Sequence, residues 1–225
     1  DYDAKALAQA LEETGLAGDL TLDQARDLIV KTVMPSLGPA LIGFAEAVDE
    51  ACKYNVPVIL HNAPQSMRKL QEVAEKGGSL VVAGHSNHPN FYPEEALENA
   101  RVLRERGAII DIATLDIFGG AGGLGSEADQ ELFCEFYRQG MVDTLSTDFA
   151  AGHFDAVLLG VENAVKSRAA SLPAVIATAT SRVADFFPAL APERGLIARD
   201  KIADLVVTDP ERISAVEMVV VGGTV

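Results

Sequence analysis

Short apolar runs alternate with amphipathic stretches through the middle of the chain. The runs have the length and β-branched content of buried strands, and they cover residues 56–60, 80–83, 108–112 and 142–147. In the stretches between and before them, apolar residues recur at spacings of three and four, which predicts helices over residues 40–54, 64–75, 93–107 and 127–139. Strands that alternate with helices predict an α/β fold with a parallel sheet.

The two ends of the chain have a different pattern. Residues 1–33 are rich in helix formers, and Thr21 and Gln24 have the spacing of a capping box. Helices are also expected at residues 154–166, 173–178 and 181–187. The last thirty residues contain two short apolar runs, 203–208 and 216–221, that predict strands of a small β appendage.

Polar side chains that can bind a metal follow three of the predicted strands. His61 and Asn62 end the first strand, His85 follows the second, and Asp148 follows the fourth. Side chains after parallel strands meet at the carboxyl edge of the sheet, where the loops carry function. Two imidazoles and a carboxylate at this edge indicate a hydrolase metal centre with a divalent ion, most simply zinc. Asp148 is also the candidate general base.

Several of these residues have alternative interpretations. His88 competes with His85 for the ligand role, and with His153 and Asn62 it is a candidate substrate contact. Asp148 could instead cap the helix that follows it. The glycine-rich segment 118–125 is compatible with a substrate loop, an anion cradle or a plain connection.

Composition narrows the class of partner. The 225 residues are 48% apolar and carry a net charge of −15 without a basic cluster, which argues against nucleic acid and anionic membranes. Cys52 and Cys134 are far apart and fit reduced thiols of a cytoplasmic protein. No apolar run reaches the roughly 18–20 residues of a membrane span. We expect a small-molecule substrate and a homo-oligomer.

The C-terminal sequence carries a family resemblance. Residues 195–209, which read GLIARDKIADLVVTD, and residues 219–224 resemble the closing signature of the amidohydrolase superfamily, with Asp200 where the family usually has glycine. The resemblance implies a TIM (β/α)8 barrel with a β-sandwich appendage, divided here into residues 1–194 and 195–225. It also implies metal ligation by His61, His85 and Asp148, which match the family's positions after strands 5, 6 and 8.

The same resemblance leaves the substrate open. The family's His-x-His pair after strand 1 does not occur in this sequence, so we expect the C-terminal half of a barrel from a longer polypeptide. Hydrolysis of a C–N bond in an amide, a cyclic amide or an amino-substituted ring is the primary prediction. The segments at residues 20–24 and 119–148 resemble the phosphonate-pathway branch, which cleaves a phosphorylated sugar, and this is the first alternative. A catalytically inactive barrel with an assembly role is the second.

Overall fold

The computed structural model describes residues 4–32, 37–118, 126–148, 156–189 and 191–225. The chain divides into two compact units, Asp1–Gly43 and Phe44–Val225. The first unit contains helices α1 (Ala4–Glu13) and α2 (Leu22–Thr32) and the beginning of α3 (Leu37–Tyr54). The predicted capping box at the start of α2 is confirmed, because the backbone N–H of Thr21 donates to Gln24 Oε1 and that of Gln24 donates to Thr21 Oγ1.

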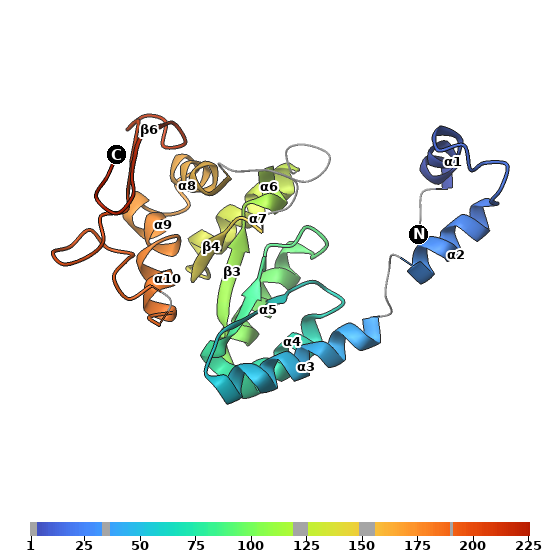
Figure 1. Ribbon diagram of the computed structural model, residues 1–225, viewed down its shortest axis with the longest axis horizontal. Helices are drawn as coiled ribbons and strands as arrows, with labels where there is room; N and C mark the ends of the chain where they lie inside the picture. The colour runs from blue at the N-terminus through green and yellow to red at the C-terminus, as the bar shows by residue number, and fades with distance from the viewer. Residues whose placement is uncertain (1–3, 33–36, 119–125, 149–155, 190) are drawn as a thin grey trace. The chain divides into compact units, whose positions relative to one another are not determined.

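The second unit is built around a four-stranded parallel sheet in the order β1-β2-β3-β4 (Figure 1). The strands are β1 (Val58–His61), β2 (Val81–Gly84), β3 (Ile109–Ala113) and β4 (Thr144–Ser146). The helical segments between successive strands are α4 (Met67–Gly77), the short 3₁₀ helix η1 (Gly78–Leu80), α5 (Pro93–Glu105), α6 (Leu115–Phe118) and α7 (Glu127–Arg138). The predicted α/β class is confirmed; the closure of such strands into a barrel stays a prediction.

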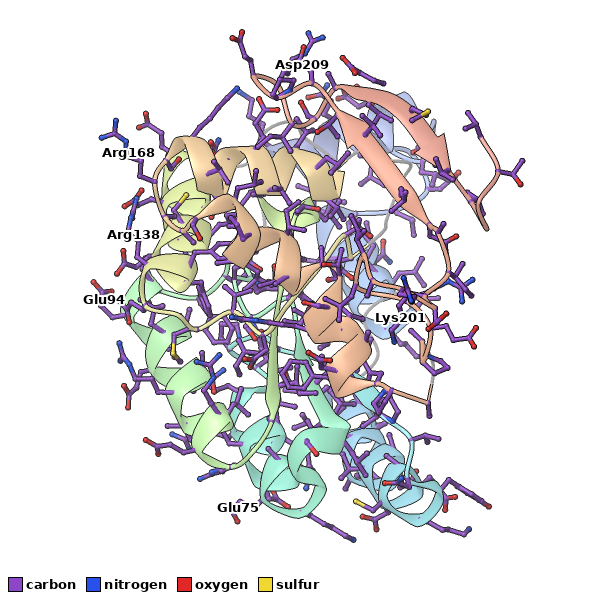
Figure 2. All side chains as sticks on the ribbon, turned by 90° about the vertical axis from the view of Figure 1, so that its left-hand side faces the viewer. Glu75, Glu94, Arg138, Arg168, Lys201 and Asp209 are labelled. Atoms are coloured by element: carbon purple, nitrogen blue, oxygen red, sulfur yellow. The ribbon has the colours of Figure 1, made fainter. Side chains whose placement is uncertain are left out.

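Alternation along the strands separates a helix-covered face from a second face. The apolar core includes Leu60, Ala83 and Ile110 from the strands together with Leu103 and Phe136 from the covering helices. Their sequence neighbours point to the other face, as the period of two in a strand requires. Charged side chains such as Glu94, Arg138 and Arg168 project outward from this unit (Figure 2).

The remaining elements follow the fourth strand. Helices α8 (Ala156–Lys166), α9 (Leu172–Thr178) and α10 (Ser181–Phe186) pack in succession, and β5 (Leu205–Thr208) pairs antiparallel with β6 (Val216–Val220) in a separate sheet. In Figure 1 these two strands stand beside α8 and α9. The two predicted strands of the appendage are therefore confirmed. Asp200, in the turn before β5, has a φ of +67°, the backbone conformation that glycine adopts most easily.

Smaller sequence predictions can also be compared with the structure. Ser126 and Asp129 form a capping box at the start of α7, as their spacing predicts. Asn55 takes a left-handed conformation after α3, with a φ of +51°, which asparagine tolerates better than most residues at a helix C-terminus. Cys52 and Cys134 are both free thiols, the second of them buried. No helix in the described part of the chain has the length and apolar character needed to cross a membrane.

Candidate metal centre

The strand register brings His61 and His85 together. His61 is the last residue of β1 and pairs with Gly84, the last residue of β2, so His85 lies one position beyond its own strand. His61 Nδ1 and His85 Nε2 are 2.6 Å apart, and the two ring centroids are 4.4 Å apart. Two neutral imidazoles at this distance either share one proton or turn both lone pairs toward a common cation. The predicted pair of metal-competent imidazoles is thus formed at the carboxyl edge of the sheet.

His88 completes a cluster of three imidazoles but differs from the other two in its hydrogen bonding. Its ring centroid lies 5.4 Å from that of His61 and 5.2 Å from that of His85. Its Nδ1 accepts a hydrogen bond of 3.1 Å from the backbone N–H of Asn90. In the neutral ring this bond assigns the proton to Nε2, which then donates and cannot bind a metal. This tautomer favours His85 over His88 as the ligand.

Asp148 lines the same concavity as His85. This concavity has a volume of about 360 Å³ and is lined by residues of the strands and by Val183 and Phe187 from the region of α10. Besides His85 and Asp148, its polar lining residues are Asp111, Thr144 and Ser146, and its apolar ones are Ile59, Val82, Leu145, Val183 and Phe187. Asp148 is exposed and its φ is +47°. The helix-cap alternative for Asp148 concerns residues 149–155, which lie outside the described part of the chain.

The ligand set is incomplete as the structure stands. Among the residues that the structure describes, no three or more histidine, cysteine, aspartate or glutamate side chains are grouped as a metal site. His61 and His85 converge, and Asp148 lines the same concavity as His85 without joining such a group. The assignment of these three residues as metal ligands therefore stays a prediction.

Asn62 occupies a different environment from the one predicted. Its side chain is 0% exposed; its Oδ1 accepts a hydrogen bond from Asn99 and its Nδ2 donates one to Ser86 Oγ. A direct contact with substrate would require breaking one of these bonds. The other two predicted substrate contacts are His88, whose ring lies beside those of His61 and His85, and His153, which lies outside the described residues.

Asp111 is a polar residue of the site that the sequence analysis did not single out. It lies in the middle of β3 and faces the concavity, where its carboxylate accepts hydrogen bonds from Ser146 Oγ, Thr144 Oγ1 and the backbone N–H of His85. Burial raises the pKa of this carboxyl group to about 6, although all three donors lower it. The signal was available, since an aspartate inside the run Ile109–Ala113 contradicts an otherwise apolar strand.

Comparison with known proteins gives a likeness of fold. No protein-family model matches the chain, and no curated protein matches it. One similar solved structure is an uncharacterized protein with 20% identity and a TM-score of 0.56, matched over 80% of this chain and 48% of its own. Another is 5-methylcytosine deaminase from Klebsiella pneumoniae liganded with 5-fluorocytosine, with 16% identity and a TM-score of 0.56, matched over 98% of this chain and 58% of its own. The chain thus spans about half the length of these structures and shares their fold.

Proposed function

We propose that the protein is a metal-dependent hydrolase of the amidohydrolase type that uses water to cleave a C–N bond in an amide, a cyclic amide or an amino-substituted ring. The observation that carries the proposal is the approach of His61 Nδ1 and His85 Nε2 to 2.6 Å at the ends of adjacent parallel strands. The shared fold with a deaminase supports the same reaction class. The closing sequence signature at residues 195–209 supports it independently.

The imidazole pair fits a zinc ion in chemistry and nearly in spacing. Zinc–nitrogen bonds of about 2.0–2.1 Å in tetrahedral geometry place two ligand nitrogens about 3.3 Å apart. The two rings would separate by roughly 0.7 Å from the 2.6 Å seen here, which small side-chain rotations provide. His61 and His85 would hold the ion, with Asp148 as a further oxygen ligand. When bound, such an ion lowers the pKa of water toward ~7 and polarises the scissile carbon.

The residues of the chain would supply the proton transfer and the environment. In this proposal Asp148 receives the proton of the attacking water on a carboxylate oxygen and hands it to the leaving nitrogen. Ile59, Val183 and Phe187 line the concavity and keep the reacting groups in an apolar surrounding, which strengthens their electrostatic interactions. In this proposal the Nε2–H of His88 donates to a substrate oxygen.

The charge of the concavity favours this reaction over the hydrolysis of a phosphorylated sugar. The described residues that line it include two carboxylates, Asp111 and Asp148, and no lysine or arginine. A phosphorylated sugar needs cationic or N–H-rich surroundings to offset the charge of its phosphate. A neutral amide or ring with a leaving nitrogen has no such need, so the C–N bond is the better match.

Metal binding provides the direct test. Purified protein should bind about one equivalent of zinc, and His61→Ala and His85→Ala should each lower the occupancy, measured by atomic emission after dialysis. His88→Ala is the matched control, because it removes an imidazole of the same cluster whose tautomer excludes ligation; its zinc occupancy should equal that of the wild type. If the two ligand variants retain full occupancy, or if His88→Ala alone loses it, the ligand assignment is wrong.

Asp148 is tested by the kinetics of an amide-preserving substitution. Asp148→Asn keeps the size of the side chain and an oxygen that can reach the metal, but the amide cannot accept the proton of water. We expect kcat to fall about 10²–10⁴-fold on a C–N substrate found by screening amides and amino-substituted rings, with an unchanged Tm. If the variant keeps more than roughly a tenth of the wild-type kcat, Asp148 is not the base.

A further inference from the structure

A chain of buried hydrogen bonds lies beside the imidazole pair. Gln71 Nε2 donates to Asn99 Oδ1 at 2.8 Å, and Asn99 Nδ2 donates to Asn62 Oδ1 at 2.9 Å. Asn62 Nδ2 donates to Ser86 Oγ at 3.0 Å, and the Ser86 hydroxyl donates to the backbone carbonyl of Ala83 at 2.9 Å. We refer to Gln71, Asn99, Asn62 and Ser86 as the amide chain. It runs from half-buried Gln71 on α4 to the interior of β2.

Every donor in the amide chain points in the same direction. If the amide of Asn62 were flipped, its NH₂ group would face the NH₂ group of Asn99. Its oxygen would then face the Ser86 hydroxyl oxygen with no proton between them, because the Ser86 proton is donated to the Ala83 carbonyl. The orientation of Asn62 is therefore fixed by its neighbours on both sides. Asn62 and Ser86 are fully buried and Asn99 is nearly so, which makes each of these bonds costly to lose.

The amide chain joins the two strand ends that carry the imidazoles. Asn62 directly follows His61 and Ser86 directly follows His85, so the Asn62–Ser86 bond connects β1 and β2 immediately beyond their last paired residues. The same two turns are also held by hydrogen bonds to backbone carbonyls: Ser66 Oγ donates to the His61 carbonyl at 2.7 Å, and the Ser86 N–H donates to the Asp111 carbonyl at 2.7 Å.

The backbone of His85 needs this support. Its φ is +41°, in the left-handed region, which costs an ordinary L-residue free energy and persists where surrounding contacts fix it. A residue held only by this turn would relax toward the extended conformation and carry its imidazole away from His61. The contacts of Ser86 with Asn62 and with Ala83 lie directly after the turn and oppose that relaxation.

We propose that the amide chain is a positioning device that holds the His61 and His85 imidazoles in their paired geometry, and through them sets the affinity of the site for a divalent metal. The part of this inference that concerns metal affinity rests on the proposed function; the pairing of the two rings does not. Asn62 acts here through the two histidines and not on substrate. Partners behind ligating histidines typically change metal affinity by 10–100-fold.

The experiment uses Asn99→Ala as its main variant, because Asn99 hydrogen-bonds to Gln71 and Asn62 and lies in α5, where alanine favours the helix. Asn62→Ala removes the central link, and Gln71→Ala removes only the outer one. Tyr137→Phe is the matched control, since it deletes a different buried hydrogen bond, 3.0 Å long, to Thr178 on α9. It should lower Tm by an amount comparable to that of Asn99→Ala but leave the geometry of the two imidazoles unchanged.

Two measurements separate positioning from general stability. In metal-free protein labelled with ¹⁵N-histidine, Asn99→Ala and Asn62→Ala should move the ring ¹⁵N shifts of His61 and His85 toward those of unpaired imidazole, at one fixed pH. The zinc Kd, from competition with a chromophoric chelator, should weaken at least tenfold. Tyr137→Phe should show wild-type ring shifts and a zinc Kd within twofold of wild type. The ring shifts and zinc Kd of Gln71→Ala should lie between those of the wild type and those of Asn99→Ala.

The outcomes are distinguishable. Ring shifts and zinc Kd that stay at the wild-type values in Asn99→Ala and Asn62→Ala, with only a lower Tm, would overturn the inference. If the wild type itself binds no zinc, the proposed function fails, and the ring shifts in the same variants still decide whether the amide chain positions the pair. If Asn62→Ala does not fold, Asn99→Ala and Gln71→Ala decide, since the proposal requires both to move the ring shifts in the same direction.

Discussion

Replacing Asp111 by asparagine should stabilise the protein at neutral pH and have much less effect in acid. Asp111 is only 5% exposed. Its carboxylate accepts hydrogen bonds from Ser146 at 2.8 Å, Thr144 at 2.8 Å and the backbone of His85 at 3.3 Å. Removal from water outweighs these three donors and raises the pKa from 3.8 to about 6. The ionised carboxylate is therefore a source of instability in the folded protein.

The sign of the pH dependence follows from proton binding. Between pH 3.8 and about 6 the folded protein retains the Asp111 proton while the unfolded chain has released it, so the free energy of unfolding falls as pH rises. The shift of roughly two pKa units, at about 1.4 kcal/mol each, amounts to about 3 kcal/mol. The penalty is absent below pH 3.8 and complete above pH 6. An amide at this position stays neutral throughout and can keep the same three partners, if the Thr144 hydroxyl turns to accept.

The test compares wild type and Asp111→Asn by urea unfolding at pH 4, 5, 6 and 7.5, with a chelator present because a bound cation would favour the carboxylate. The free energy of unfolding of the variant relative to the wild type should rise by about 3 kcal/mol from pH 4 to pH 7.5, with equal m-values. Ser146→Ala serves as a second variant: it removes a donor to the carboxylate, so the wild-type pH dependence should move to higher pH. A difference that stays constant within about 0.5 kcal/mol, or one that falls with pH, would refute this account of Asp111.

Three further changes have expected outcomes. Two hydrogen bonds lower the pKa of Glu162 from 4.5 to about 2, the larger effect coming from Lys166 and the smaller from the backbone N–H of Ser214. Their contribution to the free energy of unfolding is present above pH 4.5 and is lost as pH falls toward 2. Glu162→Gln should therefore lower the free energy of unfolding at pH 7 by about 1 kcal/mol, allowing for solvent screening, and by less at pH 3. Gly160→Ala would place a methyl group 2.6 Å from the Thr114 side chain. Overpacking costs about 1–3 kcal/mol and should outweigh the gain of about 1 kcal/mol in helix propensity, so Tm should fall. An unchanged Tm would contradict this expectation. Asp200→Gly should leave urea stability within about 0.5 kcal/mol, whereas Asp200→Ala should lose about 1 kcal/mol because its φ is +67°.

Much of the fold follows from local pattern. The four strands, the helices between them and the two capping boxes depend on residues within a few positions of one another, and short-range sequence rules describe such contacts well. The pairing of His61 with His85 was also predictable. It requires only that two strands of equal direction be neighbours, after which the register places their ends at one edge.

The residues that support the site could not be predicted in the same way. Asn62 bonds to Ser86 and Asn99, which lie 24 and 37 residues away, so no local spacing reveals the partnership. From sequence, Asn62 is simply a polar residue at a strand end, and a substrate contact is the natural hypothesis for it. The structure shows instead that the amide is enclosed and bonded at both ends, which depends on how α5 packs over the strands.

The same tertiary contacts explain why polar groups persist inside this sheet. His85 and Asp148, the predicted ligands on either side of β3, share a left-handed backbone with φ of +41° and +47°. This conformation breaks the alternation of a strand and lets a residue beyond the last pairing direct its side chain over the edge, at a cost of about 1–2 kcal/mol for most L-residues. For His85 the compensating contacts are visible: the Asp111 carboxylate and carbonyl accept from the backbone N–H groups of His85 and Ser86, and the Ser86 hydroxyl is held by Asn62. An apolar core at these positions would be easier to bury, but it would release the turn that brings His85 to His61. The buried carboxylate and the amide chain are thus best understood together, as the groups that maintain the geometry of the proposed metal centre.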